Sequence, residues 1–256
     1  MDGLDPRNAT PLLSVRHLSK SFGAVTAVDD VSLDIMPNEV VGIVGDNAAG
    51  KSTFLSLLTG YHQCDQGEFY YRGQRVEVSS PATSRRNLKI EMIYQNLSLA
   101  PDLEVWKNIF LGEEVRRFGW LLDRRTMIQR SREALARLNA KARPQDIVGT
   151  LSGGEQQTVA IARTLVFDRE LIIFDEPTAA ISLNKVRDVL QLIRDLKQHG
   201  KSVMLVSHRL EDILEVSDRI VVFSHGRIKA IVPNRDIGIE DLVRLMFENR
   251  GGDASA

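Results

Sequence analysis

The residues of this chain that are best suited to chemistry lie in a short loop bounded by two glycines, with the sequence GDNAAGKS at positions 45–52. The pattern G-x-x-x-x-G-K-[ST] predicts a loop whose backbone N–H groups surround phosphate oxygens, provided that a strand precedes it and a helix follows it. The apolar run 40–44 predicts that strand, and the apolar residues within 54–58 follow a helical spacing. The loop is therefore expected to bind a nucleoside triphosphate.

Each residue of the loop and the one after it is a candidate contact for the nucleotide: Gly45, Asp46, Asn47, Ala48, Ala49, Gly50, Lys51, Ser52 and Thr53. The helix that follows adds a partial positive charge of about half a unit at its N-terminus. In such loops the lysine reaches the β- and γ-phosphates and the hydroxyl ligates Mg²⁺. We therefore expect these two roles for Lys51 and Ser52.

A pair of carboxylates follows a second apolar strand. Asp175 and Glu176 come directly after the run 171–174 and directly before Pro177. A carboxylate at the carboxyl end of a buried strand is where nucleotide-binding sheets hold Mg²⁺, usually through water. The plain alternative is that Asp-Glu-Pro only ends a strand, since proline cannot continue one.

A third motif, LSGGEQ at 151–156, predicts a second helix N-terminus that could bind an anion. Ser152 suits the N-cap position, and Gly153 and Gly154 would leave backbone N–H groups free in the first turn. The plain alternative is an ordinary glycine-rich start of a helix. A second phosphate site beside a complete first one needs an explanation that the spacing alone does not give.

The hydrophobic pattern indicates which elements position these motifs. Strands are expected at 12–18, 27–35, 40–44, 68–71, 74–78, 90–94, 171–174, 203–206, 219–223 and 228–232. Helical spacing runs from 105 to about 165, with a loop at 144–150, and returns at 186–196 and 239–247. The alternation of strand and helix after residue 171 is typical of a mostly parallel sheet.

The bulk composition excludes several classes of protein. The 256 residues carry 33 basic and 34 acidic side chains, so no global charge favours a nucleic-acid partner. The apolar runs are far shorter than the ~20 residues of a membrane helix, and the N-terminus lacks the apolar region of a secretory signal. The single cysteine, Cys64, cannot form an internal disulfide. We expect a protein of the cytosol.

Taken in their order, the three motifs resemble the ATP-binding subunits of ABC transporters, from about Leu12 to Met246. The resemblance implies an α/β fold: a P-loop NTPase (RecA-like) core with an N-terminal antiparallel β lobe and an inserted α-helical lobe. It implies one domain over 12–246, divided into 12–95 (β lobe and P-loop core), 96–165 (helical lobe) and 166–246 (rest of the core). Residues 1–11 and 247–256 are expected to be flexible tails.

The resemblance also assigns roles in binding and hydrolysing ATP with Mg²⁺. Glu176, His208 and Gln95 would be catalytic, with Glu176 polarising the attacking water and His208 contacting the γ-phosphate. Ser52, Gln95 and Asp175 would contact the metal, and Phe22 would stack on adenine. The segment Ser152, Gly153, Gly154 and Glu155 would close on the γ-phosphate held by the opposite subunit.

The partners that the resemblance implies are a second copy or a homologous ATPase subunit in a head-to-tail dimer, transmembrane permease subunits, and indirectly an extracytoplasmic solute-binding protein. No nucleic acid is expected, and the place would be the cytoplasmic face of the inner membrane. Segments 96–103 and 108–112, together with Ser182, resemble importers of ribose, fructose or xylose. The alternative is a soluble ABC ATPase, for example in iron–sulfur cluster assembly, with no transport role.

Three positions depart from the common family pattern: Ala48, Thr158 and Ser182. The stretch 116–143 is also unusual, because it holds nine basic and two acidic residues. Its plain interpretation is a solvated helical face; contact with lipid headgroups and contact with nucleic acid are the alternatives.

Overall fold

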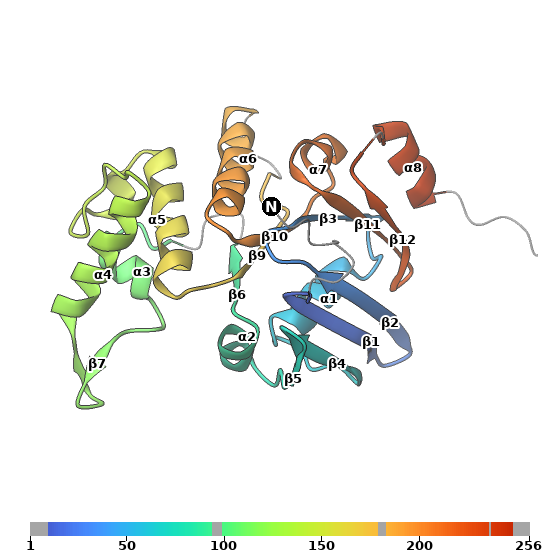
Figure 1. Cartoon of the computed structure of the whole chain (residues 1–256), viewed down its shortest axis with the longest axis horizontal. Helices are drawn as coiled ribbons and strands as arrows, with labels where there is room; N and C mark the ends of the chain where they lie inside the picture. Colours follow the sequence, from blue (N-terminus) through green and yellow to red (C-terminus); the bar gives the residue numbers. More distant parts are fainter. Residues whose placement is uncertain (1–9, 94–98, 179–182, 236, 248–256) are drawn as a thin grey trace, which may run out of the picture.

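The computed structural model describes residues 10–93, 99–178, 183–235 and 237–247, and its centre is a six-stranded sheet (Figure 1). The strand order is β12-β11-β3-β10-β9-β6. The strands are β3 (Val40–Gly45), β6 (Ile90–Ile93), β9 (Leu171–Asp175), β10 (Ser202–Val206), β11 (Arg219–Ser224) and β12 (Arg227–Pro233). All neighbouring strands are parallel except β11 and β12. The mostly parallel sheet expected from the sequence is confirmed.

Both faces of this sheet are covered, which explains why its inner strands β3, β9 and β10 are mostly apolar. Every residue of β3 and β10 is buried. On one face lie the helices α6 (Leu183–Gln198), α7 (Leu210–Val216) and α8 (Ile239–Phe247), and on the other lies α1 (Lys51–Leu58) (Figure 1). Alternate residues of a strand point to opposite faces, so Val41 and Ile43 pack on the α1 side and Val40 and Val44 on the α6 side.

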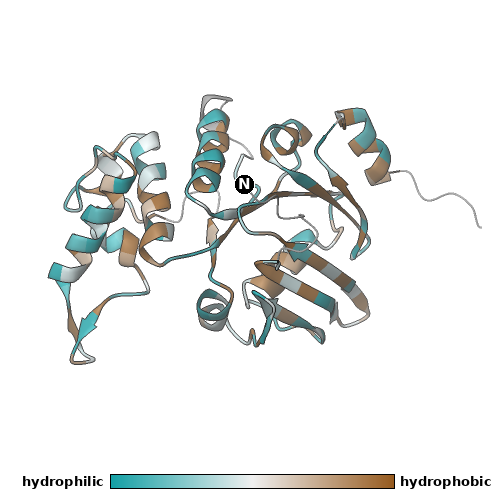
Figure 2. Ribbon diagram, in the orientation of Figure 1, coloured by the Kyte–Doolittle hydropathy of each residue, from teal (hydrophilic) through white to brown (hydrophobic). Residues whose placement is uncertain are grey.

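A second, antiparallel sheet packs against α1, with the strand order β2-β1-β4-β5. It consists of β1 (Leu13–Phe22), β2 (Val25–Ile35), β4 (Gln66–Tyr71) and β5 (Gln74–Val76). One face of β1 and β2 contributes buried residues to the α1 core, and the other face is polar, so brown and teal alternate along these strands (Figure 2). This is the N-terminal β lobe predicted from the sequence.

Three helices form a separate lobe with its own hydrophobic core. They are α3 (Val105–Phe110), α4 (Arg124–Arg137) and α5 (Gly153–Val166). A 3-10 turn at Val148–Thr150 lies between α4 and α5. Each helix contributes a fully buried residue to this core: Phe110 from α3, Met127 from α4 and Val159 from α5. No described helix is long and apolar enough to cross a bilayer.

Three short elements were not anticipated from the hydrophobic pattern. Helix α2 (Pro81–Asn87) buries only Ser84, so it has no apolar stripe, and it is initiated by a capping box of Ser80 and Thr83. Helix α7 was missed between two predicted strands. The expected helical run was wrong at one point, because a hairpin of β7 (Arg116–Arg117) and β8 (Leu121–Leu122) separates α3 from α4.

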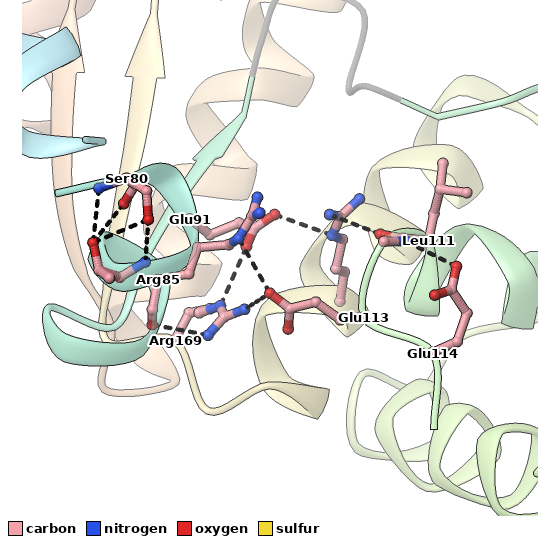
Figure 3. A network of polar contacts seen from close by, with 10 residues as sticks. Ser80, Arg85, Glu91, Leu111, Glu113, Glu114 and Arg169 are labelled. Carbon is pink, nitrogen blue, oxygen red and sulfur yellow. Dashed lines mark hydrogen bonds and ion pairs between the residues drawn. The ribbon is translucent and has the colours of Figure 1, made fainter. Parts of the chain in front are cut away.

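The helical lobe is joined to the core by a buried network of arginines and glutamates (Figure 3). Glu91 of β6 lies 3.0 Å from Nε of Arg163 in α5 and 3.2 Å from Nε of Arg169, which follows α5. Arg169 also pairs with Glu113, and Arg85 of α2 lies 3.2 Å from the same carboxylate. The side chains of Glu91 and Arg169 are 8% and 7% exposed, so these charges depend on one another for solvation.

We predict that Glu91→Gln lowers the free energy of unfolding by about 3 kcal/mol, because it removes the negative charge between two largely buried guanidinium groups. Urea denaturation of parent and variant measures this difference. The matched control is Glu77→Gln, since Glu77 is exposed and forms no ion pair among the described residues, and we expect a change within about 0.5 kcal/mol. Equal losses in the two variants would contradict the structural role of Glu91.

Candidate functional site

Four neighbouring parallel strands end at the same edge of the central sheet. Val206 pairs with Asp175 on one side and with Ile43 on the other, and Phe223 pairs with Gly45. The carboxyl ends of β3, β9, β10 and β11 are therefore level, and the segments that follow them meet. This edge is where open α/β sheets bind ligands.

A cleft of about 470 Å³ lies at this edge. It is lined by the loop residues 47–53, by the first residues of β2 at 25–27, by Glu176 and His208, and by the turn His225-Gly226. The volume lies within the range of about 300–1,000 Å³ that is typical of small-molecule sites. The structure thus brings the predicted loop together with two of the three predicted catalytic residues.

Two glycines of the loop are required by its neighbours. Gly45 has φ of 155°, and a Cβ there would lie 2.4 Å from the carbonyl oxygen of Phe223. Gly50 has φ of 99°, and its Cβ would lie 2.3 Å from the carbonyl oxygen of Ala27. Ala48 has φ of 62°, a left-handed conformation that costs an alanine about 1 kcal/mol more than a glycine.

The N-terminus of α1 offers unpaired donors to the cleft. Its N-cap, Gly50, supplies no side-chain cap, and within the described part of the chain the N–H groups of residues 50–53 have no protein acceptor. Asp46 does not point its carboxylate at these donors, because its Oδ1 accepts the N–H of Asn47 at 2.7 Å. Unpaired N–H groups at a helix N-terminus form a site for an anion such as phosphate.

Lys51 adds a positive charge that is almost withdrawn from water. The residue is 7% exposed, and its Nζ donates to the carbonyl oxygens of Gly45 at 2.7 Å and Asp46 at 2.9 Å. Burial lowers the pKa of Lys51, and the carboxylates of Glu176, Asp46 and Asp175 act in the opposite direction. Two uncharged carbonyl groups solvate this ammonium poorly, so phosphate oxygens would be better partners.

Glu176 and His208 form a contact pair beside the loop. Glu176 has φ of 50° and is held by its N–H, which donates to the carbonyl of Val206 at 2.9 Å. Its Oε2 accepts the N–H of His208 at 3.2 Å, and its Oε1 lies 3.1 Å from Nε2 of the same histidine. Oε1 is buried and makes no hydrogen bond of good geometry among the described residues. The carboxylate therefore keeps one acceptor oxygen that has no hydrogen bond among the described residues and is covered by the imidazole of His208.

Burial changes the acidity of both carboxylates at this edge. It raises the pKa of Asp175, an effect opposed by Lys51 and His208, and it also raises the pKa of Glu176. Asp175 lies at the end of β9, and Ser52 is exposed in the cleft; one carboxylate and one hydroxyl suit a hard cation that keeps water and phosphate ligands. The described residues contain no group of three His, Cys, Asp or Glu that could bind a metal alone.

Some residues predicted for the site lie outside the cleft. Phe22 is 44% exposed at the end of β1 and packs its ring edge on His62, with 5.1 Å between centroids, although its strand partner Val25 lines the cleft. Gln95 and Ser182 lie outside the described residues.

The segment Ser152 to Glu155 begins α5 in the helical lobe and does not line the cleft of its own chain (Figure 1). Ser152 and Glu155 form a capping box, in which the N–H of Ser152 donates to Oε2 of Glu155 at 2.9 Å and the N–H of Glu155 donates to Oγ of Ser152 at 3.4 Å. A Cβ added at Gly153 or Gly154 would have no neighbour within 4 Å. This helix start is open to a ligand or a partner.

Sequence reasoning missed the cleft residues 25–27, His225 and Gly226. The strands on either side of this turn, at 219–223 and 228–232, were predicted, but the position of the turn beside the loop depends on the pairing of β11 with β3. Gly226 donates its N–H to the carbonyl of Ala49 at 2.9 Å, so the turn supports the loop directly. No local signal identifies such a partner, because the two segments are far apart in the sequence.

Comparison with known proteins identifies this arrangement. Residues 28–179 match the family model described as ABC transporter. A nucleotide-free ATP-binding cassette from an ABC transporter superposes with a TM-score of 0.74 at 25% identity, covering 93% of this chain and 96% of that one. An ATP-binding cassette of an ABC transporter in its ADP conformation gives a TM-score of 0.74 at 25% identity, covering 91% and 94%.

Relatives with higher identity carry more specific names. A xylose/arabinose import ATP-binding protein of Sulfolobus acidocaldarius is 41% identical over 92% of this chain and 93% of its own length. A fructose import ATP-binding protein of Rhizobium meliloti is 38% identical over 92% and 94%. A ribose import ATP-binding protein of Rubrobacter xylanophilus is 41% identical over 95% of this chain but 49% of its own length, so the chain spans about half of that relative. By its sequence, its fold and the cleft at the edge of its sheet, the chain belongs to the ABC transporter family.

Proposed function

We propose that this chain binds and hydrolyses ATP as the nucleotide-binding subunit of an importer for a monosaccharide. One observation carries the enzymatic part: the unpaired N-terminus of α1 and the buried ammonium of Lys51 face the Glu176–His208 pair across a single cleft. The names of three relatives, which import ribose, xylose or arabinose, and fructose, support the sugar.

Binding of the triphosphate follows from the unpaired donors. The N–H groups of residues 50–53 bind phosphate oxygens, and Lys51 exchanges its two carbonyl partners for the β- and γ-phosphates. Ser52 and Asp175 would hold Mg²⁺. Gln95, which the sequence resemblance assigns to the metal, would be a further ligand. The ion, when bound, neutralises charge that develops between the β- and γ-phosphates.

Hydrolysis requires a water molecule in line with the γ-phosphate. Glu176 accepts a proton from this water, and the backbone N–H of His208 fixes Oε2 of its carboxylate. The imidazole of His208, which is about half exposed, contacts the γ-phosphate. A raised pKa of Glu176 makes it a stronger base than an ordinary carboxylate.

One chain supplies only part of the site. The open start of α5 at 152–155 lies in the other lobe, away from its own cleft. A second copy, or a homologous ATPase subunit, arranged head to tail would bring this helix N-terminus to the γ-phosphate, where its free N–H groups add to those of α1. Phe22, exposed at the end of β1, then stacks on adenine.

The partners of the dimer are proposed to be transmembrane permease subunits and, indirectly, an extracytoplasmic solute-binding protein, with the ATPase on the cytoplasmic face of the inner membrane. No nucleic-acid partner is proposed, since basic and acidic residues nearly balance. The alternative, a soluble ABC ATPase without transport, has less support because all the relatives cited above are named for sugar import.

We expect Glu176→Gln to lower the rate of ATP hydrolysis about 100-fold or more while nucleotide affinity changes little, since the amide cannot take up the proton. Phosphate release and binding of a fluorescent ATP analogue measure the two quantities. Glu211→Gln, at an exposed position in α7, is the control and should hydrolyse at the parent rate. A Glu176 variant that also keeps the parent rate would remove the assigned role.

The pKa shift of Glu176 adds a dependence on pH to this prediction. Activity requires the charged carboxylate, so the rate of the parent should fall on the acid side at a pH above that of an unperturbed glutamate. The stability contribution has the opposite sign: it is fully present below the unfolded pKa and is lost as the pH rises through the raised folded pKa. Urea denaturation at neutral pH should therefore find Glu176→Gln at least as stable as the parent, and the difference should shrink in acid.

Mixing two inactive variants tests the split site. Lys51→Ala removes the phosphate contact, and Gly154→Asp places a negative charge at the start of α5 in open space, so the fold should be unaffected. Each variant alone should be inactive. In a head-to-tail dimer the mixture contains one intact site per heterodimer, so roughly a quarter of the parent rate should return if the two sites are independent. No recovery in a mixture shown to contain heterodimers would contradict sites shared between subunits.

The proteins that co-purify with the chain test the transport role. Glu176→Gln should hold Mg-ATP and remain closed, so it should co-purify with its partners from gently solubilised cells, and mass spectrometry identifies them. We expect a polytopic permease, whose sequence would narrow the sugar. Recovery of cluster-assembly factors or ribosomal proteins with no membrane protein would support the soluble alternative instead.

A further inference from the structure

The hairpin between α3 and α4 exposes a group of large apolar side chains. All residues from 116 to 122 are exposed, with Phe118 at 84% and Trp120 at 75%, and Leu121 and Leu122 are about half exposed. Phe118 and Trp120 are the two most exposed large apolar side chains among the described residues. Figure 1 shows this hairpin extending beyond the three helices of its lobe. Exposure of these apolar side chains to water is unfavourable, and a partner that covers them would lower the free energy of the system.

Hydrogen bonds fix the base of the hairpin, so they hold the tip in a defined position relative to α4. The N–H of Asp123 donates to the carbonyl of Val115 at 2.8 Å and closes the hairpin. The carboxylate of Asp123 accepts hydrogen bonds from the N–H of Thr126 at 3.1 Å and from the hydroxyl of Thr126 at 2.8 Å. These two bonds join the hairpin to the first turn of α4. The two strands pair Arg116 with Leu122 and Arg117 with Leu121.

Arginines surround the apolar tip. Arg116 and Arg117 precede it and Arg124 and Arg125 follow it, and all four are exposed. Arg124 and Arg125 also line, with Arg132, a shallow hollow of about 780 Å³ along α4.

The acidic groups nearby are already engaged. Asp123 holds Thr126, and its Oδ2 is 3.9 Å from Nε of Arg117. Glu104 pairs with Lys107 at 2.7 Å and lies 3.9 Å from Arg124. Glu133 accepts from Gln129 at 3.1 Å. Over residues 114–125 the four arginines still outnumber the two acidic residues, Glu114 and Asp123, so the tip lies in a moderate excess of positive charge.

This combination matches the surface of an anionic bilayer better than the surface of a protein. Tryptophan and phenylalanine are favoured at the boundary between headgroups and acyl chains, and arginines beside them attract anionic lipid headgroups. The tip extends beyond the helices of its lobe (Figure 1), so a deformable partner can cover it from more than one side. Binding of this kind combines buried apolar area with attraction between opposite charges.

We propose that the tip 118–122 inserts into the interfacial region of a membrane rich in anionic lipid, with the four arginines at the level of the lipid phosphates. The helical lobe then contacts the bilayer directly, and not only through a permease. The contact uses none of the nucleotide site, so it stands or falls separately from the proposed function.

Sedimentation of the full chain with vesicles tests this contact. Vesicles of phosphatidylcholine with about a third phosphatidylglycerol should bind the parent, and pure phosphatidylcholine vesicles should bind it at least tenfold more weakly. Because Trp106 is 6% exposed and Trp120 is 75% exposed, a blue shift on binding, and quenching by brominated acyl chains, should come from Trp120 and be absent in Trp120→Phe.

Two variants locate the contact. Phe118→Ser with Trp120→Ser should weaken binding at least tenfold, and Arg116→Gln with Arg117→Gln should weaken it about as much and reduce its dependence on salt. Phe247→Ser is the control, because Phe247 is 60% exposed at the end of α8, far from the hairpin (Figure 1), and its binding should equal that of the parent. Thermal unfolding and ATPase rates establish that all variants are folded.

Three results would overturn the proposal. The first is no sedimentation of the parent with anionic vesicles, and the second is equal binding by the hairpin variants and by Phe247→Ser. The third is loss of a co-purifying membrane protein in the hairpin variants with no binding of the parent to vesicles, since the tip would then dock on protein and not on lipid.

Discussion

The site depends on one electrostatic arrangement: a buried ammonium group held between a helix N-terminus and two carboxylates. Lys51 cannot reach bulk water, and its present partners are two uncharged carbonyl groups. Burial disfavors the charged forms of Asp175 and Glu176 as well as that of Lys51. Opposite charges at one edge of the sheet therefore stabilise each other only in part, and on the proposed function a bound phosphate with its metal would complete the balance.

The fold maintains this arrangement through close backbone contacts. The loop is bounded by the carbonyl oxygens of Phe223 and Ala27, which leave no room for a Cβ at Gly45 or Gly50. These carbonyls belong to β11 and β2, strands of two different sheets that meet at the cleft. The shape of the phosphate loop is thus determined by tertiary packing as much as by its own sequence. A substitution in either supporting strand could change nucleotide affinity without touching the nucleotide.

The same distinction explains how much the sequence could predict. Local patterns were sufficient for the loop, for the carboxylates at the end of β9 and for the capped start of α5, because each motif lies within a few consecutive residues. They were insufficient for His225 and Gly226, whose place in the cleft depends on strand order, and for α2, which has no apolar stripe. The hairpin 116–122 was hidden in an expected helical run, since its exposed leucines and aromatic residues have the composition of a helix core. Apolar residues in a sequence predict burial, and here the structure places them in solvent.

The separation of the two helix N-termini has a consequence for how nucleotide can move the molecule. The start of α1 lies in the core and that of α5 in the helical lobe, and the lobe has its own hydrophobic core and a charged junction to β6. On the proposed function, a γ-phosphate bound at α1 of one subunit attracts α5 of the other, so ATP binds the closed dimer more tightly than the open one. That difference in affinity is the only means by which a ligand can shift the equilibrium. Hydrolysis transfers the γ-phosphoryl group to water, and release of the resulting phosphate removes the charge that both helix termini share, and with it the reason for closure.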